Sequence, residues 1–344
     1  MLPRDHMEDL KKLEEELLQP SPDLIEAIGK LEGNLLVLGA GGKMGPDLAI
    51  LANGAFMASG KNNRVIAVSR FTNQETEDRL RGNNIEICKA DLLDDKQLQA
   101  LPDVNNIIYM AGTKFGTTGN EPYTWAMNTY LPGRIALRFQ DSRIVAFSTG
   151  NVYPLVNFNT GGSTENDSPS PVGEYGQSCL GRERIMEHFS INNQILMLII
   201  RLNYANDFRY GVLVEIAKSV LEEKKIDLST GYVNVIWQGD ANEYALRSLA
   251  LCTSPAKILN VTGPGVLSVR WLATEFGKLF RKNPCFINKE QPTALLNNAS
   301  QIHALMGLPK ISVERMIGLI YTWLKNNGKT INKPTHYQER KGDF

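Results

Sequence analysis

The stretch "LLVLGAGGKMGPDLAILA", residues 35–52, joins a short apolar run to a helical pattern through a turn rich in glycine. Gly39, Gly42 and Gly45 follow the spacing GxxGxxG. Glycine lets the chain turn tightly and approach a ligand, and the free N–H groups at a helix start attract negative charge. A strand, a glycine turn and a helix in this order are typical of sites for the pyrophosphate of a dinucleotide. We therefore predict a dinucleotide site that includes Gly39, Gly42, Lys43, Met44 and Gly45. A tight turn without a ligand is the alternative.

Further apolar runs of similar length follow along the chain, at residues 64–70, 85–91, 106–112, 143–149 and 194–201. They are apolar throughout and alternate with helical stretches. Strands of this kind are typical of a parallel sheet that helices cover on both faces. The sequence therefore predicts an α/β fold: a Rossmann-type, doubly wound parallel sheet with a smaller, interleaved C-terminal substrate lobe.

We expect three segments along the chain. Residues 1–32 repeat apolar positions at helical spacing and predict an N-terminal helical arm. Residues 33–205 carry the regular alternation and form the predicted dinucleotide-binding domain. Residues 206–344 alternate less regularly, which predicts mainly a substrate-binding lobe, with strands at about 232–262 that return to the first domain.

Composition excludes several classes of function. Among the 344 residues, Lys and Arg together equal Asp and Glu together, at 37 each, so no net charge recruits nucleic acid or an anionic membrane. The longest aliphatic run, residues 195–200, is too short to span a bilayer, and we expect a cytoplasmic protein. The four cysteines form no CxxC pair and the four histidines have no partner at ligand spacing, so we predict no metal site.

The second apolar run ends in Ser69 and Arg70. An acidic residue at this place would bind the adenosine ribose hydroxyls and favour NAD. A hydroxyl and a guanidinium can instead bind a 2′-phosphate, which favours NADP, with NAD still possible. The alternative is that Arg70 stacks on the adenine or points into solvent.

From residue 35 to residue 263 the chain resembles the extended short-chain dehydrogenase/reductase family, which includes the NAD-dependent epimerases and dehydratases. Besides the glycine turn, the ordered motifs are "KADLLD" (89–94), "YMAGTKFG" (109–116), "WAMNTYLPG" (125–133), "FSTGNVY" (147–153) and "EYGQSCLGRE" (174–183). The resemblance implies cofactor contacts by Asp91, Leu92, Ala111, Gly112, Asn128, Ser148, Tyr175 and Cys179. It also implies that Thr149 orients the substrate and that Tyr175 is the catalytic acid/base.

The chain departs from the family at Cys179, which stands where the family has a lysine that lowers the pKa of the tyrosine. Free tyrosine has a pKa near 10 and is a poor base without a neighbouring cation. We favour a packing role for Cys179 over a thiolate nucleophile. Lys114 should lie at the carboxyl edge of the sheet and is our preferred replacement cation, the alternative being a lysine that faces solvent. Arg182, seven residues after Tyr175, is expected on an unsuitable face of the helix.

Substrate contacts are predicted from Asn151 and from polar or aromatic residues further along the chain: Arg209, Asn234, Trp237 and Gln238. Indole rings and amide groups stack on and hydrogen-bond to sugars. Packing within the lobe is the alternative for Trp237. Gly150 and Asn151 stand where the dehydratases of the family place an Asp-Glu pair, and neither can protonate a leaving hydroxyl, which disfavours that reaction.

Two functions stay open at this point. The first is an NAD(P)-dependent oxidoreductase or epimerase that acts on a carbohydrate-like alcohol or ketone. The second is a redox-inactive NADP-binding sensor or scaffold subunit, which the missing lysine favours. The family resemblance also implies a homodimer.

Overall fold

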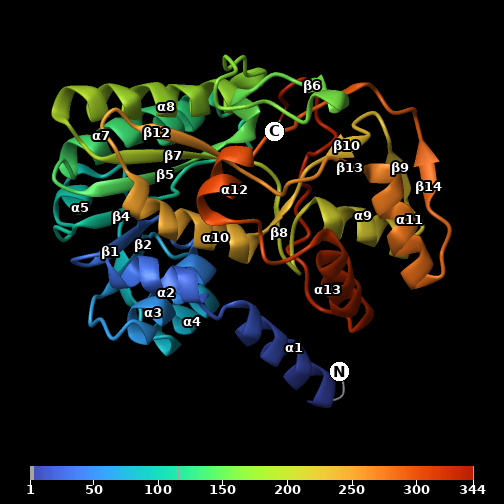
Figure 1. The fold of residues 1–344 in the computed structure, drawn as a ribbon, viewed down its shortest axis with the longest axis horizontal. Coiled ribbons are helices and arrows are strands. Elements are labelled where there is room, and N and C mark those ends of the chain that lie inside the picture. The colour runs from blue at the N-terminus through green and yellow to red at the C-terminus, as the bar shows by residue number, and fades with distance from the viewer. Residues whose placement is uncertain (1–3, 115, 344) are drawn as a thin grey trace.

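The computed structural model describes residues 4–114 and 116–343 of the chain. In this part of the chain seven parallel strands form one sheet, in the order β12-β7-β5-β4-β1-β2-β3 (Figure 1). The strands are β1 (Leu35–Leu38), β2 (Val65–Ser69), β3 (Glu86–Lys89), β4 (Asn106–Tyr109), β5 (Arg143–Thr149), β7 (Met197–Leu202) and β12 (Lys257–Val261). Each apolar run of the sequence supplies one strand, so the predicted doubly wound parallel sheet is confirmed.

Helices cover both faces of the sheet, and the side chains of β1 alternate between the two cores. Leu35 and Val37 pack in the core that also holds residues of α2 (Pro22–Gly29), α3 (Gly45–Ala58), α4 (Gln74–Gly82), α10 (Gln238–Arg247) and α12 (Ser300–Met306). Leu36 and Leu38 pack in the opposite core, with residues of α5 (Asp95–Gln99), α7 (Leu131–Arg138) and α8 (Gly173–Asn193). A strand apolar on both faces therefore holds two helix layers together.

A third core lies beside the carboxyl edge of the sheet, at the right of Figure 1. Its helices are α9 (Val212–Leu221), α11 (Val269–Phe280) and α13 (Val313–Lys325). Short strand pairs surround it: β8 (Ala205–Asn206) with β11 (Ile236–Trp237), β9 (Lys225–Asp227) with β14 (Cys285–Ile287), β10 (Tyr232–Val233) with β13 (Leu267–Ser268), and β6 (Val156–Asn157) with β15 (Thr293–Ala294). The predicted division of the chain at residues 32 and 205 stays a prediction.

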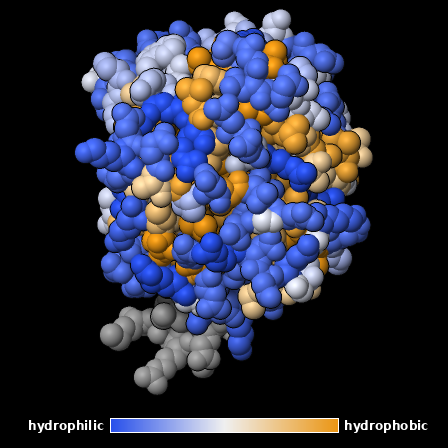
Figure 2. Space-filling model, turned by 90° about the vertical axis from the view of Figure 1, so that its left-hand side faces the viewer, coloured by the Kyte–Doolittle hydropathy of each residue, from blue (hydrophilic) through white to orange (hydrophobic). Residues whose placement is uncertain are grey.

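The remaining elements are α1 (Arg4–Leu17), α6 (Glu121–Trp125), a π-helical turn η1 (Ala126–Tyr130) and three 3-10 turns, η2 (Gly150–Val152), η3 (Phe158–Thr160) and η4 (Ser248–Leu251). After α13 the described chain has no helix or strand up to residue 343. On the face that Figure 2 shows, hydrophilic residues predominate and apolar ones form separate patches. No helix among the described residues has the length and apolar character needed to cross a bilayer.

Candidate active site

The glycine turn after β1 requires glycine for two geometric reasons. Gly39 has a φ of +93°, and a Cβ on it would lie 2.6 Å from the backbone N of Ala111. A Cβ on Gly45 would lie 2.5 Å from the carbonyl oxygen of Ala40. Met44 precedes α3 without a side-chain hydrogen bond to the first turn. The turn therefore runs against the end of β4, and no side chain caps the amide groups that open α3.

A cavity of about 280 Å³ extends from this turn along the ends of β1 to β4. Predicted cofactor residues line it: Gly39, Gly42, Ser69, Arg70, Asp91, Leu92, Ala111 and Gly112. The sequence reasoning missed other lining residues, among them Gly41, Phe71 and Met127. Two of these residues could have been predicted from the sequence, because Gly41 lies inside the glycine turn and Phe71 follows Arg70 directly. We name this space the adenosine cavity.

A second cavity, of about 200 Å³, brings together the three predicted catalytic residues Tyr175, Thr149 and Lys114. The Lys114 Nζ lies 5.9 Å from the centre of the Tyr175 ring and donates a hydrogen bond of 3.4 Å to the carbonyl oxygen of Thr335. Further predicted residues on its wall are Lys43, Met44, Ser148 and Asn151. We name this space the tyrosine cavity. Thr335, Asn203, Tyr204 and Tyr210 also line it and were not predicted.

Burial dominates the protonation chemistry of the tyrosine cavity. It lowers the pKa of Lys43 to about 8, although Asp207 acts in the opposite direction. It also lowers the pKa of Lys114 to about 8, against the influence of Cys179 and Glu215. Burial raises the pKa of Tyr175, and Cys179 raises it further, whereas Arg182 and a hydrogen bond with Thr149 lower it. Each group therefore favours its neutral form more than it would in water.

No known family model matches the sequence, and no curated protein does. Solved structures are similar in fold. A UDP-glucuronic acid 4-epimerase from Bacillus cereus, solved with NAD, is 18% identical and aligns over 86% of this chain and 100% of its own, with a TM-score of 0.70. A UDP-glucose 4-epimerase from Thermotoga maritima, solved with UDP-glucose, is 15% identical over 86% and 99%, with a TM-score of 0.69. A dTDP-glucose 4,6-dehydratase from Streptomyces venezuelae, solved with NAD, is 17% identical over 86% and 97%, with a TM-score of 0.71.

The chain has the Rossmann-like α/β fold of these three enzymes. This confirms the fold that the ordered motifs predict. At identities below one fifth, the likeness establishes the fold and leaves the chemistry to the residues of this chain.

Cys179 packs behind the tyrosine cavity, in a small apolar cluster with Val152, Tyr153 and Tyr175. Its side chain is buried, and burial raises the pKa of its thiol. A neutral, buried thiol is a weak nucleophile, so the arrangement is that of a packed side chain.

Asn128 connects the elements behind both cavities. It lies in the π-helical turn η1, a deviation often found at functional sites, and its side chain is fully buried. Its Nδ2 donates to the carbonyl oxygen of Thr113 at 2.8 Å and to the Ser178 hydroxyl at 3.1 Å, and its Oδ1 accepts from the Thr113 amide at 2.9 Å. The same Oδ1 accepts a hydrogen bond of 2.8 Å from Arg182. Asn128 therefore fixes the loop after β4 to helix α8.

The expected unsuitable position of Arg182 is wrong. Seven residues span nearly two helical turns, so positions 175 and 182 of α8 share a face. Arg182 is buried and acts electrostatically on both Tyr175 and Cys179. It is the functional candidate that the sequence reasoning rejected.

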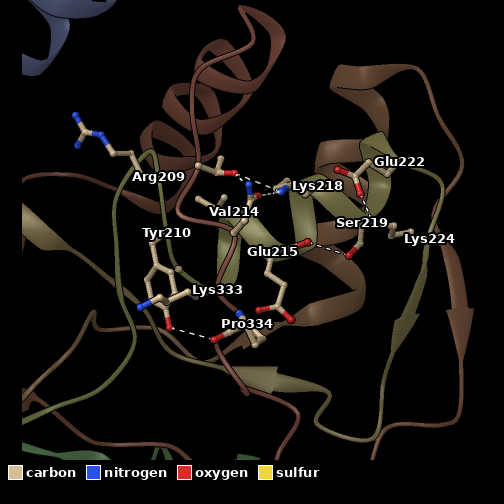
Figure 3. Close-up of a pocket in the computed structure, with 13 residues that line it drawn as sticks. Arg209, Tyr210, Val214, Glu215, Lys218, Ser219, Glu222, Lys224, Lys333 and Pro334 are labelled. Atoms are coloured by element: carbon tan, nitrogen blue, oxygen red, sulfur yellow. Dashed lines mark hydrogen bonds and ion pairs between the residues drawn. The ribbon is translucent and has the colours of Figure 1, made fainter. Parts of the chain in front are cut away.

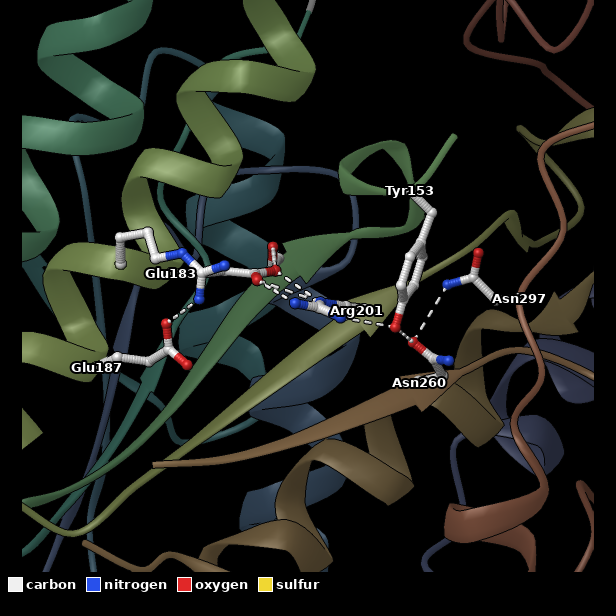
Figure 4. A network of polar contacts seen from close by, with 8 residues as sticks. Tyr153, Glu183, Glu187, Arg201, Asn260 and Asn297 are labelled. Carbon is white, nitrogen blue, oxygen red and sulfur yellow. Dashed lines mark hydrogen bonds and ion pairs between the residues drawn. The ribbon is translucent and has the colours of Figure 1, made fainter. Parts of the chain in front are cut away.

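A buried polar network lies beyond Arg182 on the same helix (Figure 4). Glu183 binds Arg201 of β7, with 2.7 Å between Oε2 and Nη2, and accepts a hydrogen bond of 2.5 Å from Ser148. Arg201 Nη1 donates to the Tyr153 hydroxyl at 2.6 Å, and that hydroxyl donates to Asn260 at 3.0 Å. Ser148 therefore lines the tyrosine cavity while its hydroxyl is held by Glu183.

Most of the predicted substrate residues lie outside the tyrosine cavity. Arg209 lines a separate cavity of about 400 Å³ between α9 and residues 330–334 (Figure 3), and it pairs with Glu14. Trp237 is buried in the third core, and the side chain of Gln238 donates to Asp47 at 2.8 Å. Asn234 is buried behind the tyrosine cavity, where it accepts a hydrogen bond of 2.9 Å from Asn203.

The C-terminal segment contributes to the cleft. Thr335 is buried and binds Glu215 of α9 through its amide at 2.8 Å and its hydroxyl at 2.7 Å. The backbone of Gly342 lies so close to Gly173, at the start of α8, that a Cβ on Gly173 would be 2.4 Å from its carbonyl oxygen. Within the described residues no group of histidines, cysteines and carboxylates has the arrangement of a metal site.

Proposed function

We propose that the chain is an NAD(P)-dependent oxidoreductase or epimerase that acts on a carbohydrate-like alcohol or ketone. One observation carries this proposal: Tyr175, Thr149 and Lys114 share a single cavity that lies next to the glycine turn. A hydroxyl acid/base, a second hydroxyl and a cation at one place are the groups that a proton transfer to or from a substrate oxygen requires.

The residues around the glycine turn fit a dinucleotide. Gly39 leaves no room for a side chain between the ends of β1 and β4, and the uncapped start of α3 presents amide donors to a pyrophosphate. The adenosine cavity holds Asp91 and Arg70 at the ends of two neighbouring strands. Arg70 is exposed at its rim, which supports the choice of NADP over NAD, since a guanidinium binds a 2′-phosphate.

A nicotinamide dinucleotide held by the glycine turn and the adenosine cavity would supply the hydride donor or acceptor. The chain's own residues manage the accompanying proton. The Tyr175 hydroxyl exchanges it with the substrate oxygen, Thr149 orients that oxygen by a hydrogen bond, and the charge of Lys114 favours the phenolate. Asn151 lies on the same wall, and its amide can bind a further hydroxyl.

The substrate class follows from the cavity and from similar folds. The compared epimerases were solved with UDP-glucose or NAD. In this chain Thr335 closes one side of the tyrosine cavity, which favours a small sugar or sugar acid. A homodimer in the cytoplasm remains a prediction from sequence.

The second candidate is a redox-inactive NADP-binding sensor or scaffold. Cys179 in place of lysine favours this candidate. Burial raises the pKa of Tyr175, and a cysteine supplies no positive charge to lower it again. The two candidates differ in one property: only the enzyme changes the redox state of a bound cofactor.

The test is to bind NADP and NAD to the purified protein and to follow nicotinamide absorbance with a panel of free sugars, sugar acids and nucleotide sugars. Tyr175→Phe should lower turnover by about 100-fold or more, since general acid/base catalysis contributes this much, and should leave cofactor affinity unchanged. Tyr153→Phe, in the buried network, tests whether loss of any nearby tyrosine hydroxyl has the same effect. Cofactor binding without redox change across the panel would favour the sensor.

A further inference from the structure

Arg182 is a buried cation whose hydrogen bonds all go to neutral oxygens. Its side chain extends from α8 one turn after Cys179, and the residue is 6% exposed. Nη1 donates to the carbonyl oxygen of Phe147 at 2.6 Å. Nε donates to the carbonyl oxygen of Asn128 at 3.3 Å, and Nη2 to its side-chain oxygen at 2.8 Å.

The nearest carboxylate in sequence forms no ion pair with this charge. Glu183 is the next residue on α8, and it binds Arg201 through both carboxylate oxygens, as Figure 4 shows. Among the described residues, Arg182 forms no ion pair with Asp or Glu within 4.0 Å. A buried charge without a counterion is costly, so its surroundings favour the arrival or formation of negative charge.

The guanidinium packs behind the wall of the adenosine cavity and lies on the same face of α8 as Tyr175 and Cys179. A Cβ on Gly112, which lines the adenosine cavity, would be 2.4 Å from Arg182 Nη2. The centre of the guanidinium is 5.8 Å from the centre of the Tyr109 ring at the end of β4. Towards the other cavity, Arg182 acts on the Tyr175 hydroxyl and on the Cys179 thiol, and it favours the ionised form of both.

We propose that Arg182 supplies, together with Lys114, the positive charge of the missing lysine: it is a positioning residue whose fixed charge favours the phenolate of Tyr175 from within the helix. This inference rests on the proposed function of Tyr175 as acid/base. Arg182 does not touch the substrate. Hydrogen bonds to Asn128 and Phe147 fix its planar guanidinium and therefore the position of the charge. The lysine of the family would instead carry a mobile point charge nearer to the tyrosine.

Other titratable groups also face Tyr175 and have to be separated from Arg182 in any test. They are Cys179 on α8, Lys114 after β4, Lys43 in the glycine turn, and Tyr204 and Tyr210 across the tyrosine cavity. A variant at position 182 leaves all of these in place.

The experiment measures the ionisation of Tyr175 directly. Protein labelled with carbon-13 at the tyrosine Cζ is titrated by NMR with saturating NADP, and the Tyr175 resonance is the one that Tyr175→Phe removes. Arg182→Gln removes the charge while retaining amide donors, and Arg182→Lys retains the charge. Arg184→Gln is the matched control, because Arg184 lies two residues further on the same helix and is exposed in a pair with Glu187.

Arg182→Gln should raise the midpoint of Tyr175 by about one pH unit or more, the size that loss of a nearby opposite charge produces. Arg182→Lys and Arg184→Gln should remain within about half a unit of the unmodified chain, well below that shift. An unchanged midpoint in folded, NADP-binding Arg182→Gln would overturn the proposal. If Arg182→Gln does not fold, Arg182→Lys decides: a shift as large as one unit despite the retained charge contradicts an electrostatic role.

Failure of the proposed function has a different signature. An unmodified chain that binds neither NADP nor NAD contradicts the proposed enzyme before any titration. If the cofactor binds and the titration midpoint of Tyr175 is the same in Arg182→Gln as in the unmodified chain, only the role of Arg182 is contradicted.

Discussion

Two buried arginines at helix α8 differ in their partners: one forms an ion pair and the other does not. Arg201, from β7, is held by both oxygens of Glu183 and by the Tyr153 hydroxyl (Figure 4). Arg182, from α8 itself, contacts only neutral oxygens among the described residues. The first charge is paired with a carboxylate within the fold, and the second is buried without an ion pair among the described residues.

The difference follows from helix geometry. Successive residues of an α-helix point about 100° apart, so Arg182 and Glu183 have different partners although both reach β5. Glu183 binds Ser148 of β5 and Arg201 of β7. Arg182 instead binds the carbonyl oxygen of Phe147 in β5 and both oxygens of Asn128 in η1. One helical step thus separates a structural charge pair from a charge beside the proposed catalytic tyrosine.

The largest expected effect is on protein stability, when the buried ion pair of Glu183 and Arg201 is broken. Glu183→Gln leaves Arg201 buried without its counterion and should lower the free energy of unfolding by about 3–5 kcal/mol. Glu187→Gln, one turn later on α8, breaks a partly exposed pair with Arg184 and should cost at most about 0.5 kcal/mol. Urea unfolding of both variants measures this difference. Equal decreases in the free energy of unfolding would contradict the distinction between the buried pair and the partly exposed one.

A second test concerns a cation at the rim of the adenosine cavity. Arg70→Ala should weaken NADP binding about tenfold, which corresponds to about 1.4 kcal/mol, because the 2′-phosphate loses its guanidinium partner. NAD lacks that phosphate, so its affinity should change much less. Arg81→Ala, on the exposed surface of α4, is the control for loss of one positive charge. Equal weakening of NADP and NAD in calorimetric titrations would remove the cofactor preference.

The sequence predicts features that are local in the chain. The glycine turn and the six apolar runs each lie within a few residues, and their order is sufficient to identify the sheet. The electrostatics of the site depend on distant partners. Thr335 binds Lys114 across 221 positions of sequence. Glu183 binds Arg201 across 18 positions, from a helix to a strand.

Side-chain type alone was also misleading where burial decides the role. Trp237 and Gln238 have the chemistry of sugar-binding residues, yet one packs in the third core and the other binds Asp47. Arg182 was rejected by a spacing rule that considered one helical turn only. In both cases the missing information was which neighbours the folded chain places around the residue.

The smallest expected effect concerns the pH dependence of cofactor binding. Burial lowers the pKa of Lys114 to about 8, so its charge is present at pH 7 and lost as the pH rises above 8. A cation in a poorly solvated cavity attracts the anionic dinucleotide, and its loss should weaken NADP binding up to about fivefold between pH 7 and pH 9, close to 1 kcal/mol. Lys43, whose pKa is also lowered to about 8, contributes in the same direction.

Lys114→Met should therefore reduce this pH dependence without removing it, because Lys43 still titrates. Lys96→Met, exposed on α5, should leave the pH profile unchanged. Arg182 keeps its charge over this range, so it adds nothing to the pH dependence. If NADP affinity depends as steeply on pH in Lys114→Met as in the unmodified chain, Lys114 does not act on the cofactor. Lys114 would then act on Tyr175 alone, and Lys43 would act on the cofactor.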